Sequence, residues 1–205
     1  MKSFSKKLLE WYNPTSRNLP WKQTNDAYKI WLSEIILQQT RVEQGTPYYL
    51  AFIKKYPTVK KLANAPLDDV LKLWEGLGYY SRARNLHVAA QQILEIHQGK
   101  FPETYAEIVA LKGIGNYTAA AIASFAYNLP HAVVDGNVFR VLSRVFGIET
   151  PIDSTEGKKQ FAQLAQQLLD KKKPSIHNQA IMDFGALMCK PQNPLCEQCP
   201  FSSEC

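Results

Sequence analysis

Cysteine is absent from the long first part of the chain, because all four cysteines follow Met188. A disulfide framework normally spreads its cysteines along the sequence so that they close long loops. The clustering therefore argues against disulfides and favours one compact metal site near the carboxyl end. The residues concerned are Cys189, Cys196, Cys199 and Cys205.

Long apolar runs are also missing. The longest, Thr118–Tyr127, has ten residues and falls well short of a membrane span. The first residues of the chain lack the apolar core of a signal peptide. We therefore expect a protein that is neither secreted nor embedded in a membrane, located in the cytoplasm and, in a bacterium, associated with the nucleoid.

Two catalytic signatures and most strand patterns are absent as well. The sequence contains neither a Gly-x-Ser-x-Gly elbow nor a phosphate-loop Gly-Lys-Ser/Thr motif, which weakens serine hydrolase and nucleoside triphosphatase interpretations. The alternation that is typical of a strand is confined to one short candidate at residues 131–134. The histidines form no pair with the spacing of metal ligands.

What remains is the composition of a mostly helical globular protein. Of 205 residues, 45% are apolar and 20% charged, which is enough to build the core of one or two domains. Apolar residues recur at intervals of three and four within 67–77, 84–97 and 160–169, as in amphipathic helices. The net charge of +6 favours a polyanionic partner, although this signal is weak alone.

The cysteine tail, residues 189–205, has the spacing Cys-x6-Cys-x2-Cys-x5-Cys. Four thiolates in so short a peptide can converge on one metal centre. Zinc ribbons usually have two close cysteine pairs and this tail has one, whereas a [4Fe–4S] cluster tolerates uneven spacing. The spacing alone leaves zinc and iron–sulfur equally open.

A Gly-x-Gly turn at Gly113 and Gly115 joins two helical patterns. Glycine permits close approach of the backbone, and the amino end of the next helix presents free N–H groups to an anion such as DNA phosphate. An ordinary connection between two helices explains the same turn.

Two carboxylates stand out by their surroundings. Asp135 follows a short apolar run and precedes a helical pattern, which predicts a helix N-cap with an ionised carboxylate. Glu34 lies inside the nearly apolar run Ile30–Leu37, where partial burial would raise its pKa, although a solvent-facing glutamate is the more common case. Two acids with pKa values shifted apart suit acid-assisted cleavage of a glycosidic bond.

Glycines, aromatic residues and cations are combined in the segment 76–84. Such a loop can place the ring of Tyr79 in a base stack and a cation such as Arg82 on a phosphate. A helix connection with tyrosines in the core explains the same composition equally well.

Taken in order, these motifs resemble the helix-hairpin-helix DNA glycosylases that carry an iron–sulfur cluster, and most of all the A/G-specific adenine glycosylases of the MutY type. The resemblance runs from about Leu9 to Cys205, and the ordered set is specific although each motif alone is modest. Its motifs are Leu19–Trp21, Trp31–Thr40, Gly76–Arg82, the turn within 111–122, Val134–Asn137 and the cysteine tail.

The resemblance implies an all-α, two-domain helix-hairpin-helix DNA glycosylase fold. Residues 26–129 would form a helical barrel domain, and residues 1–25 and 130–205 a second helical domain that carries a [4Fe–4S] cluster at 189–205. The active site would lie between the two domains. The implied activity is base excision repair by a monomer acting on double-stranded DNA that contains A·8-oxoguanine or A·G mispairs.

The resemblance also assigns roles residue by residue. Glu34 would be the general acid that protonates the flipped adenine, Asp135 the carboxylate that stabilises the oxocarbenium-like sugar, and Asn137 the residue that orders that carboxylate. Tyr117 stands where relatives of the endonuclease III type carry a Schiff-base lysine, which implies a monofunctional enzyme that leaves an abasic site. Contacts with DNA or the base are implied for Leu37, Gln38, Gln39, Thr40, Tyr79, Arg82, Gly113 and Gly115, and cluster ligation for Cys189, Cys196, Cys199 and Cys205.

One departure from the family and two alternatives remain. Family members usually continue into a further domain that helps to recognise 8-oxoguanine, whereas this sequence ends at its last cysteine, as a catalytic portion or a short member would. A thymine glycosylase for T·G mismatches shares the scaffold, and a non-catalytic DNA-binding module is the alternative from another class. Glu34 and the motif Val134–Asn137 favour adenine.

Overall fold

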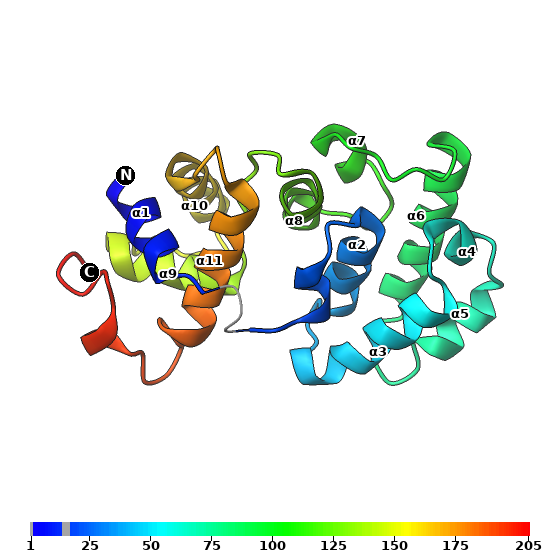
Figure 1. The fold of residues 1–205 in the computed structure, drawn as a ribbon, viewed down its shortest axis with the longest axis horizontal. Coiled ribbons are helices and arrows are strands. Elements are labelled where there is room, and N and C mark those ends of the chain that lie inside the picture. The colour runs from blue at the N-terminus through cyan, green and yellow to red at the C-terminus, as the bar shows by residue number, and fades with distance from the viewer. Residues whose placement is uncertain (1, 14–16) are drawn as a thin grey trace. The chain divides into compact units, whose positions relative to one another are not determined.

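The computed structural model describes residues 2–13 and 17–205, and every regular element in these ranges is a helix (Figure 1). The mostly helical chain that the periodicity predicts is thereby confirmed. Within the described ranges, no helix is long and apolar enough to cross a membrane. The helices are α1 Lys2–Trp11, η2 Pro20–Gln23, α2 Ala27–Ile36, α3 Val42–Lys55, α4 Val59–Ala63, α5 Leu67–Leu73, α6 Ser81–Ile96, α7 Tyr105–Val109, α8 Asn116–Tyr127, α9 Gly136–Phe146, α10 Thr155–Leu168, α11 Pro174–Leu187 and η3 Cys196–Gln198.

The short strand candidate at residues 131–134 is irregular in the structure. A side-chain amide takes the place of a neighbouring strand. Asn178 of α11 accepts a hydrogen bond from the Val133 N–H at 3.2 Å and donates one to the His131 carbonyl at 2.8 Å. Because a side chain satisfies these backbone groups, the segment does not need a sheet.

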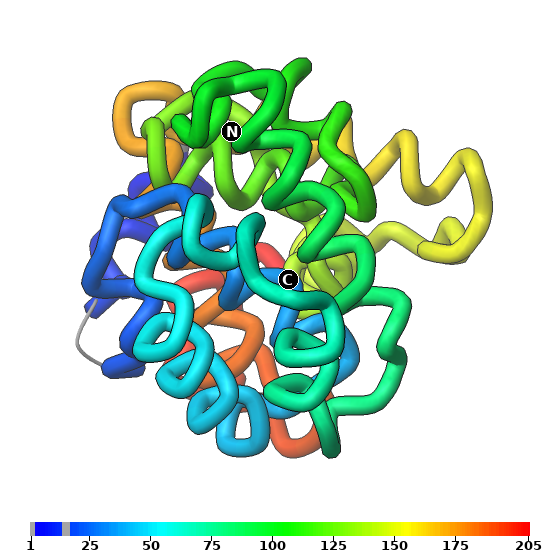
Figure 2. Tube along the Cα trace, turned by 90° about the vertical axis from the view of Figure 1, so that its right-hand side faces the viewer, coloured from blue at the N-terminus to red at the C-terminus, as the bar shows by residue number. Residues whose placement is uncertain are grey.

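Internal contacts divide the chain into two compact units. One unit comprises residues 19–127, and the other joins the residues up to 18 with residues 128–205. The blue amino-terminal helix α1 and the orange helix α11 belong to the same unit and pack together, as Figures 1 and 2 show. This division places residues 19–25 with 26–127, whereas the sequence-based boundaries place them with the other domain.

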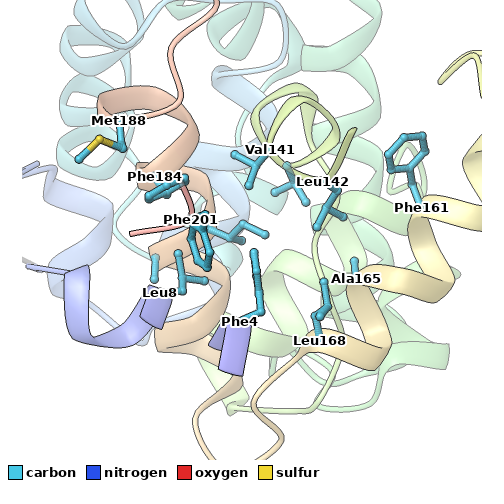
Figure 3. Close-up of a cluster of buried hydrophobic side chains, with 13 residues drawn as sticks. Phe4, Leu8, Val141, Leu142, Phe161, Ala165, Leu168, Phe184, Met188 and Phe201 are labelled. Carbon is cyan, nitrogen blue, oxygen red and sulfur yellow. The ribbon is translucent and has the colours of Figure 1, made fainter. Parts of the chain in front are cut away.

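A shared core holds together the unit that contains both ends of the chain (Figure 3). Phe4 of α1 stacks on Phe201 of the cysteine tail with ring centroids 4.7 Å apart. Phe201 also meets Phe184 of α11 edge-on at 5.3 Å, and all three rings are buried. Because burying a side chain of this size contributes about 1.5–3 kcal/mol, Phe201 anchors the tail to the helices.

Helix α2 is the centre of the unit of residues 19–127. It packs against α8, α3 and α6, and eight of its ten residues are buried. Residues 118–124 of α8 form an unbroken buried run that is rich in alanine, which lets the two helices approach closely. A helix that is apolar all round belongs inside a protein. The apolar run Thr118–Tyr127 is therefore a core helix.

Candidate active site

Glu34 is one of two residues of α2 that are not fully buried. The helix begins at the cap Asp26, whose carboxylate accepts a hydrogen bond from the Tyr28 N–H at 3.0 Å. On the turn before Glu34, Ile30 and Trp31 are buried. Of the two settings considered for Glu34, the structure shows partial burial, while its role as an acid stays a prediction.

Two exposed residues with a left-handed backbone follow α2 and precede α6. Gln39 has φ 54°, and Tyr79 has φ 45° with 65% of its surface exposed. This conformation is costly for residues other than glycine and collects at functional sites. Around Gln39, Leu37, Gln38 and Thr40 are half-buried, and the Thr40 N–H donates to the Leu37 carbonyl at 3.2 Å.

Arg82 connects these two loops from the first turn of α6. Its guanidinium donates to the carbonyl of Gln38 in one loop and to the carbonyl of Gly78, at 3.4 Å, in the other. The structure therefore brings the predicted base-contacting segments 37–40 and 78–79 together.

The Gly-x-Gly turn docks on α6. Gly113 has φ 75°, and a Cβ atom at this position would lie 2.7 Å from the Cβ of Asn85. The neighbouring Lys112 N–H donates to the Gln92 side chain at 2.8 Å. Gly113 is thus in close contact with α6, whereas a Cβ at Gly115 would meet open space. The approach of DNA phosphate to both glycines stays a prediction. Both glycines are exposed, just before α8 begins.

Tyr117 lies in the first turn of α8 and is half-buried. This helix is otherwise buried from 118 to 124, so its amino-terminal turn is the part that borders the hairpin. The phenol of Tyr117 carries no amine and cannot form a Schiff base.

Asp135 caps helix α9, as the sequence predicts. One carboxylate oxygen accepts a hydrogen bond from the Val138 N–H at 2.8 Å, and the other accepts one from the side chain of Asn137 at 2.8 Å. Asp135 is half-buried at the positive end of the helix dipole. The two hydrogen bonds fix the orientation of the carboxylate, so that it could face a cation that develops nearby.

A chain of hydrogen bonds leads from Asp135 to the cysteine tail. Asn137, which donates to Asp135, accepts a hydrogen bond from Arg140 at 2.8 Å. Arg140 also donates to the carbonyl oxygens of Gly185 at 2.7 Å and Cys189 at 2.8 Å. At Gly185 a Cβ atom would lie 2.6 Å from the Cβ of Asn137, so α9 and α11 are in close contact here.

Arg144, one turn further along α9, also holds the tail. It donates to the carbonyls of Lys190 at 2.8 Å and Pro191 at 3.2 Å and lies 3.5 Å from the sulfur of Cys189. Sequence reasoning did not single out Arg140 or Arg144. Their spacing of four on the helix that Asp135 begins was the available signal.

The thiol of Cys199 is influenced by the other three cysteines of the tail. Burial raises the pKa of the Cys199 thiol, and the nearby Cys189, Cys205 and Cys196 raise it further. Within the described residues, no three Cys, His, Asp or Glu side chains are close enough together to hold a metal ion. Four thiols without a competing ligand type nevertheless fit a soft metal centre.

The site residues fall in both units. Glu34, the loops 37–40 and 76–79, and the hairpin belong to residues 19–127, whereas Asp135, Asn137 and the tail belong to the other unit.

Comparison with known proteins identifies the class to which these features belong. Residues 32–171 match the model of the HhH-GPD superfamily base excision DNA repair proteins, and residues 189–205 match the iron–sulfur binding domain of endonuclease III. The chain belongs to the HhH-GPD superfamily. The second match decides the question left open by the spacing in favour of iron–sulfur over zinc and confirms the expected [4Fe–4S] cofactor, with the four cysteines as the available ligands.

Within this superfamily, the chain is similar to curated adenine DNA glycosylases. The chain is 43% identical to an adenine DNA glycosylase of Buchnera aphidicola and 45% identical to that of Homo sapiens, over 98% and 99% of its own length. It spans 57% and 39% of the lengths of these two relatives.

Among solved structures, a thermostable thymine-DNA glycosylase superposes with a TM-score of 0.90 at 31% identity, covering 100% of this chain and 94% of that one. A non-covalent endonuclease III–DNA complex superposes with a TM-score of 0.80 at 20% identity, covering 99% and 92% of the two chains. These likenesses confirm the expected all-α helix-hairpin-helix glycosylase fold.

Proposed function

We propose that the chain is the catalytic portion of a monofunctional adenine DNA glycosylase. Its substrate is double-stranded DNA in which adenine is mispaired with 8-oxoguanine or guanine, and its product is an abasic site. The observation that carries the proposal is Asp135, a carboxylate fixed by Val138 and Asn137 at the start of α9. The identity of 43–45% to adenine DNA glycosylases supports adenine as the base.

The proposed reaction divides the chemistry between two carboxyl groups. Glu34 donates a proton to the flipped adenine, so that the base leaves as a neutral molecule when the glycosidic bond breaks. The bonding electrons leave with the base, and positive charge develops on the sugar. Asp135 stabilises that cation, and water then adds to the sugar carbon and loses a proton.

Asn137 has a positioning role in this scheme. The Asn137 side-chain N–H donates to Asp135, and the Asn137 side-chain oxygen accepts from Arg140. Because Arg140 fixes the amide of Asn137, Asn137 in turn fixes the carboxylate of Asp135. A carboxylate with a fixed orientation needs no reorganisation as charge develops on the sugar.

The absence of a strand-cleaving step is proposed from Tyr117. A lyase of this fold needs an amine to attack the sugar, and Tyr117 supplies a phenol at the start of α8. The abasic site therefore stays intact until alkali or another enzyme cleaves it.

DNA contacts are proposed for the hairpin and for the two left-handed loops. Exposed backbone N–H groups around Gly113 and Gly115 bind phosphate at the amino end of α8. Gln39 and Tyr79 contact the bases around the mispair, and Leu37 helps to line the adenine pocket. Extruding a base costs a few kcal/mol, and a mispair lowers that cost.

The cluster has a structural role in the proposed enzyme. When bound, it cross-links four positions of the tail through thiolates. Arg140 and Arg144 attach the same tail to α9, the helix that begins at Asp135.

The direct test is base release from duplexes that contain A opposite 8-oxoguanine, A opposite G, or T opposite G, each analysed with and without hot alkali. We expect adenine release, with strand breaks only after alkali. Strand breaks without alkali would contradict the monofunctional assignment. If no base is released from any duplex, the proposal that the chain is a DNA glycosylase is contradicted.

The acid is tested separately by Glu34→Gln. We expect this variant to bind the duplex like the parent but to release adenine at least about a hundredfold more slowly, because a general acid contributes about 10²–10⁴ in rate. Glu43→Gln is the matched control, since Glu43 is exposed in the first turn of α3. Unchanged base release by Glu34→Gln would exclude the residue as the acid.

A thymine glycosylase for T·G mismatches is the second candidate, and the superposition on a thymine-DNA glycosylase favours it. Release of thymine alone in the three-duplex assay would decide for this candidate.

A further inference from the structure

The side chain of Arg82 is bound to the end of helix α2. Its Nη1 atom donates to the carbonyls of Ile35 and Ile36, at 3.1 Å each, and to the carbonyl of Gln38. The hydroxyl of Thr40 lies at 3.5 Å. These acceptors are the last carbonyls of α2 and the turn after it, which a helix leaves without partners of its own.

The other half of the guanidinium is bound to the loop before α6. Nη2 donates to the carbonyls of Leu77 at 3.0 Å and Gly78 at 3.4 Å. The indole of Trp74 donates to the same Gly78 carbonyl at 2.9 Å. One planar group thus joins two loops that are about forty residues apart in the sequence.

Two aromatic rings also lie close to the guanidinium. Its central carbon lies 5.1 Å from the ring centre of the buried Trp74 and 5.7 Å from that of the exposed Tyr79. Cations are attracted to aromatic faces at such distances. Arg82 therefore contacts the side chain of Tyr79 as well as the backbone of its loop.

This arrangement contradicts the simplest interpretation of Arg82, that of a phosphate contact. A guanidinium has five N–H donors. Within the described residues, those of Nη1 and Nη2 point to protein oxygens, and Nε is buried. A bidentate contact to phosphate needs a free edge of the group, and none remains here.

Each of the two residues that follow these carbonyls has a left-handed backbone. Gln39 comes directly after Gln38, and Tyr79 directly after Gly78. Non-glycine residues keep this conformation only where surrounding contacts impose it. The donors of Arg82 to Gln38 and Gly78 supply such contacts on both loops.

We propose that Arg82 is a positioning residue that holds Gln39 and Tyr79 in place on the base-contacting surface and does not itself contact DNA. The hydrogen-bonded joining of the two loops is a property of the unit of residues 19–127 alone. Its consequence for base recognition rests on the proposed function.

Hydrogen exchange of the cluster-loaded protein tests the joining without any DNA. We compare Arg82→Lys and Arg82→Gln with the parent, because lysine keeps the charge but cannot reach both loops with one planar group. We expect peptides covering 36–41 and 76–80 to exchange at least tenfold faster in both variants. The peptide covering 118–124 in the buried part of α8 should be unchanged. Unchanged exchange at both loops would overturn the proposal.

The salt dependence of duplex binding tests whether Arg82 touches phosphate. Each phosphate contact adds about 0.9 to the slope of log affinity against log salt. We expect Arg82→Gln to keep the parental slope. A slope that is smaller by about 0.9 in Arg82→Gln would overturn the proposal, because it would show a direct contact between Arg82 and a phosphate. Arg84→Gln, which removes an exposed cation from the same turn of α6, shows how the assay responds to a lost surface charge.

Single-turnover base release then tests the action through Tyr79. We expect Arg82→Lys to slow adenine release at least tenfold while affinity for an undamaged duplex stays within twofold. In a Tyr79→Ala background the same change should slow release less than threefold, because the ring that Arg82 positions is gone. If Arg82→Lys slows release by the same factor in the Tyr79→Ala background as in the parent, Arg82 does not act through Tyr79 and this part of the proposal is overturned.

Two outcomes separate this inference from the proposed function. A parent protein that releases no base while both Arg82 variants loosen the loops would defeat the proposed function and leave the joining intact. If neither variant folds, Trp74→Phe removes the indole donor to Gly78 and keeps an aromatic ring in the core. The Trp74→Phe variant should then exchange hydrogen faster in the peptide 76–80 and at the parental rate in the peptide 36–41. Equal acceleration in the two peptides would overturn the proposal.

Discussion

The capping carboxylate Asp135 allows its structural and chemical contributions to be separated by two substitutions. Asp135→Asn keeps a side-chain oxygen that can accept from the Val138 N–H, because asparagine caps helices as well as aspartate does. Asp135→Ala removes both acceptors, at 2.8 Å each. Both changes remove the negative charge.

The stability cost follows from the hydrogen bonds. Losing the cap costs about 1 kcal/mol, and losing the bond from Asn137 to a charged acceptor about 1.5–3 kcal/mol. Asp135→Ala should therefore lose roughly 3 kcal/mol, which lowers Tm by about 6–12 °C at the 2–4 °C per kcal/mol typical of this size. Asp135→Asn keeps the cap and should lose about 1 kcal/mol.

The effect on base release should not follow this order. Removing one fixed group that stabilises transition-state charge costs about 10²–10³ in rate. Because both variants lose the same charge, both should release adenine at least about a hundredfold more slowly than the parent.

Thermal unfolding followed by circular dichroism and single-turnover base release, run well below every Tm, measure the two effects. Ser154→Ala is the matched control, since Ser154 caps α10 by accepting from the Gly157 N–H at 2.9 Å. It should cost about 1 kcal/mol and leave base release unchanged. If Asp135→Asn releases adenine at a rate within tenfold of the parent, the negative charge of Asp135 does not stabilise the sugar cation and the reasoning is refuted.

Three other changes give distinct readouts. Burial lowers the pKa of His177 from 6.5 to about 4, so the unfolded chain takes up a proton that the folded chain does not. Stability in urea should then fall by roughly 2 kcal/mol from pH 7 to pH 5, and His177→Asn should remove that part of the loss. Gly113→Ala, which forces a Cβ to 2.7 Å from Asn85, should cost more than 1 kcal/mol and weaken duplex binding in a fluorescence titration, unlike Gly115→Ala. Tyr117→Lys should produce a borohydride-trapped adduct with DNA that the parent does not form, and no adduct would show that the amine cannot reach the sugar.

Local signals in the sequence correctly predicted several features. The period of three to four residues predicted helices, and the aspartate between an apolar run and a helical pattern predicted the cap at Asp135. The Gly-x-Gly sequence at 113–115 predicted a turn between two helices, and it lies between α7 and α8. These features depend on a few neighbouring residues, so they can be recognised without the fold.

The strand candidate at residues 131–134 shows the limit of such local signals. Residues 131–134 have the composition of a strand, but Asn178 satisfies their backbone from helix α11. A partner more than forty residues away in the sequence leaves no sign in the segment itself.

By itself, the sequence determined the helical class of the protein, the cysteine tail with its four ligands, and the motifs that place the chain in its superfamily. Only the tertiary structure decided what Arg82, Arg140 and Arg144 bind. An arginine in a helix has the same local pattern whether it faces solvent or donates to distant carbonyls. Its role depends on which backbone oxygens the folded chain brings within about 3 Å of the guanidinium, and that is decided by packing between segments far apart in the sequence.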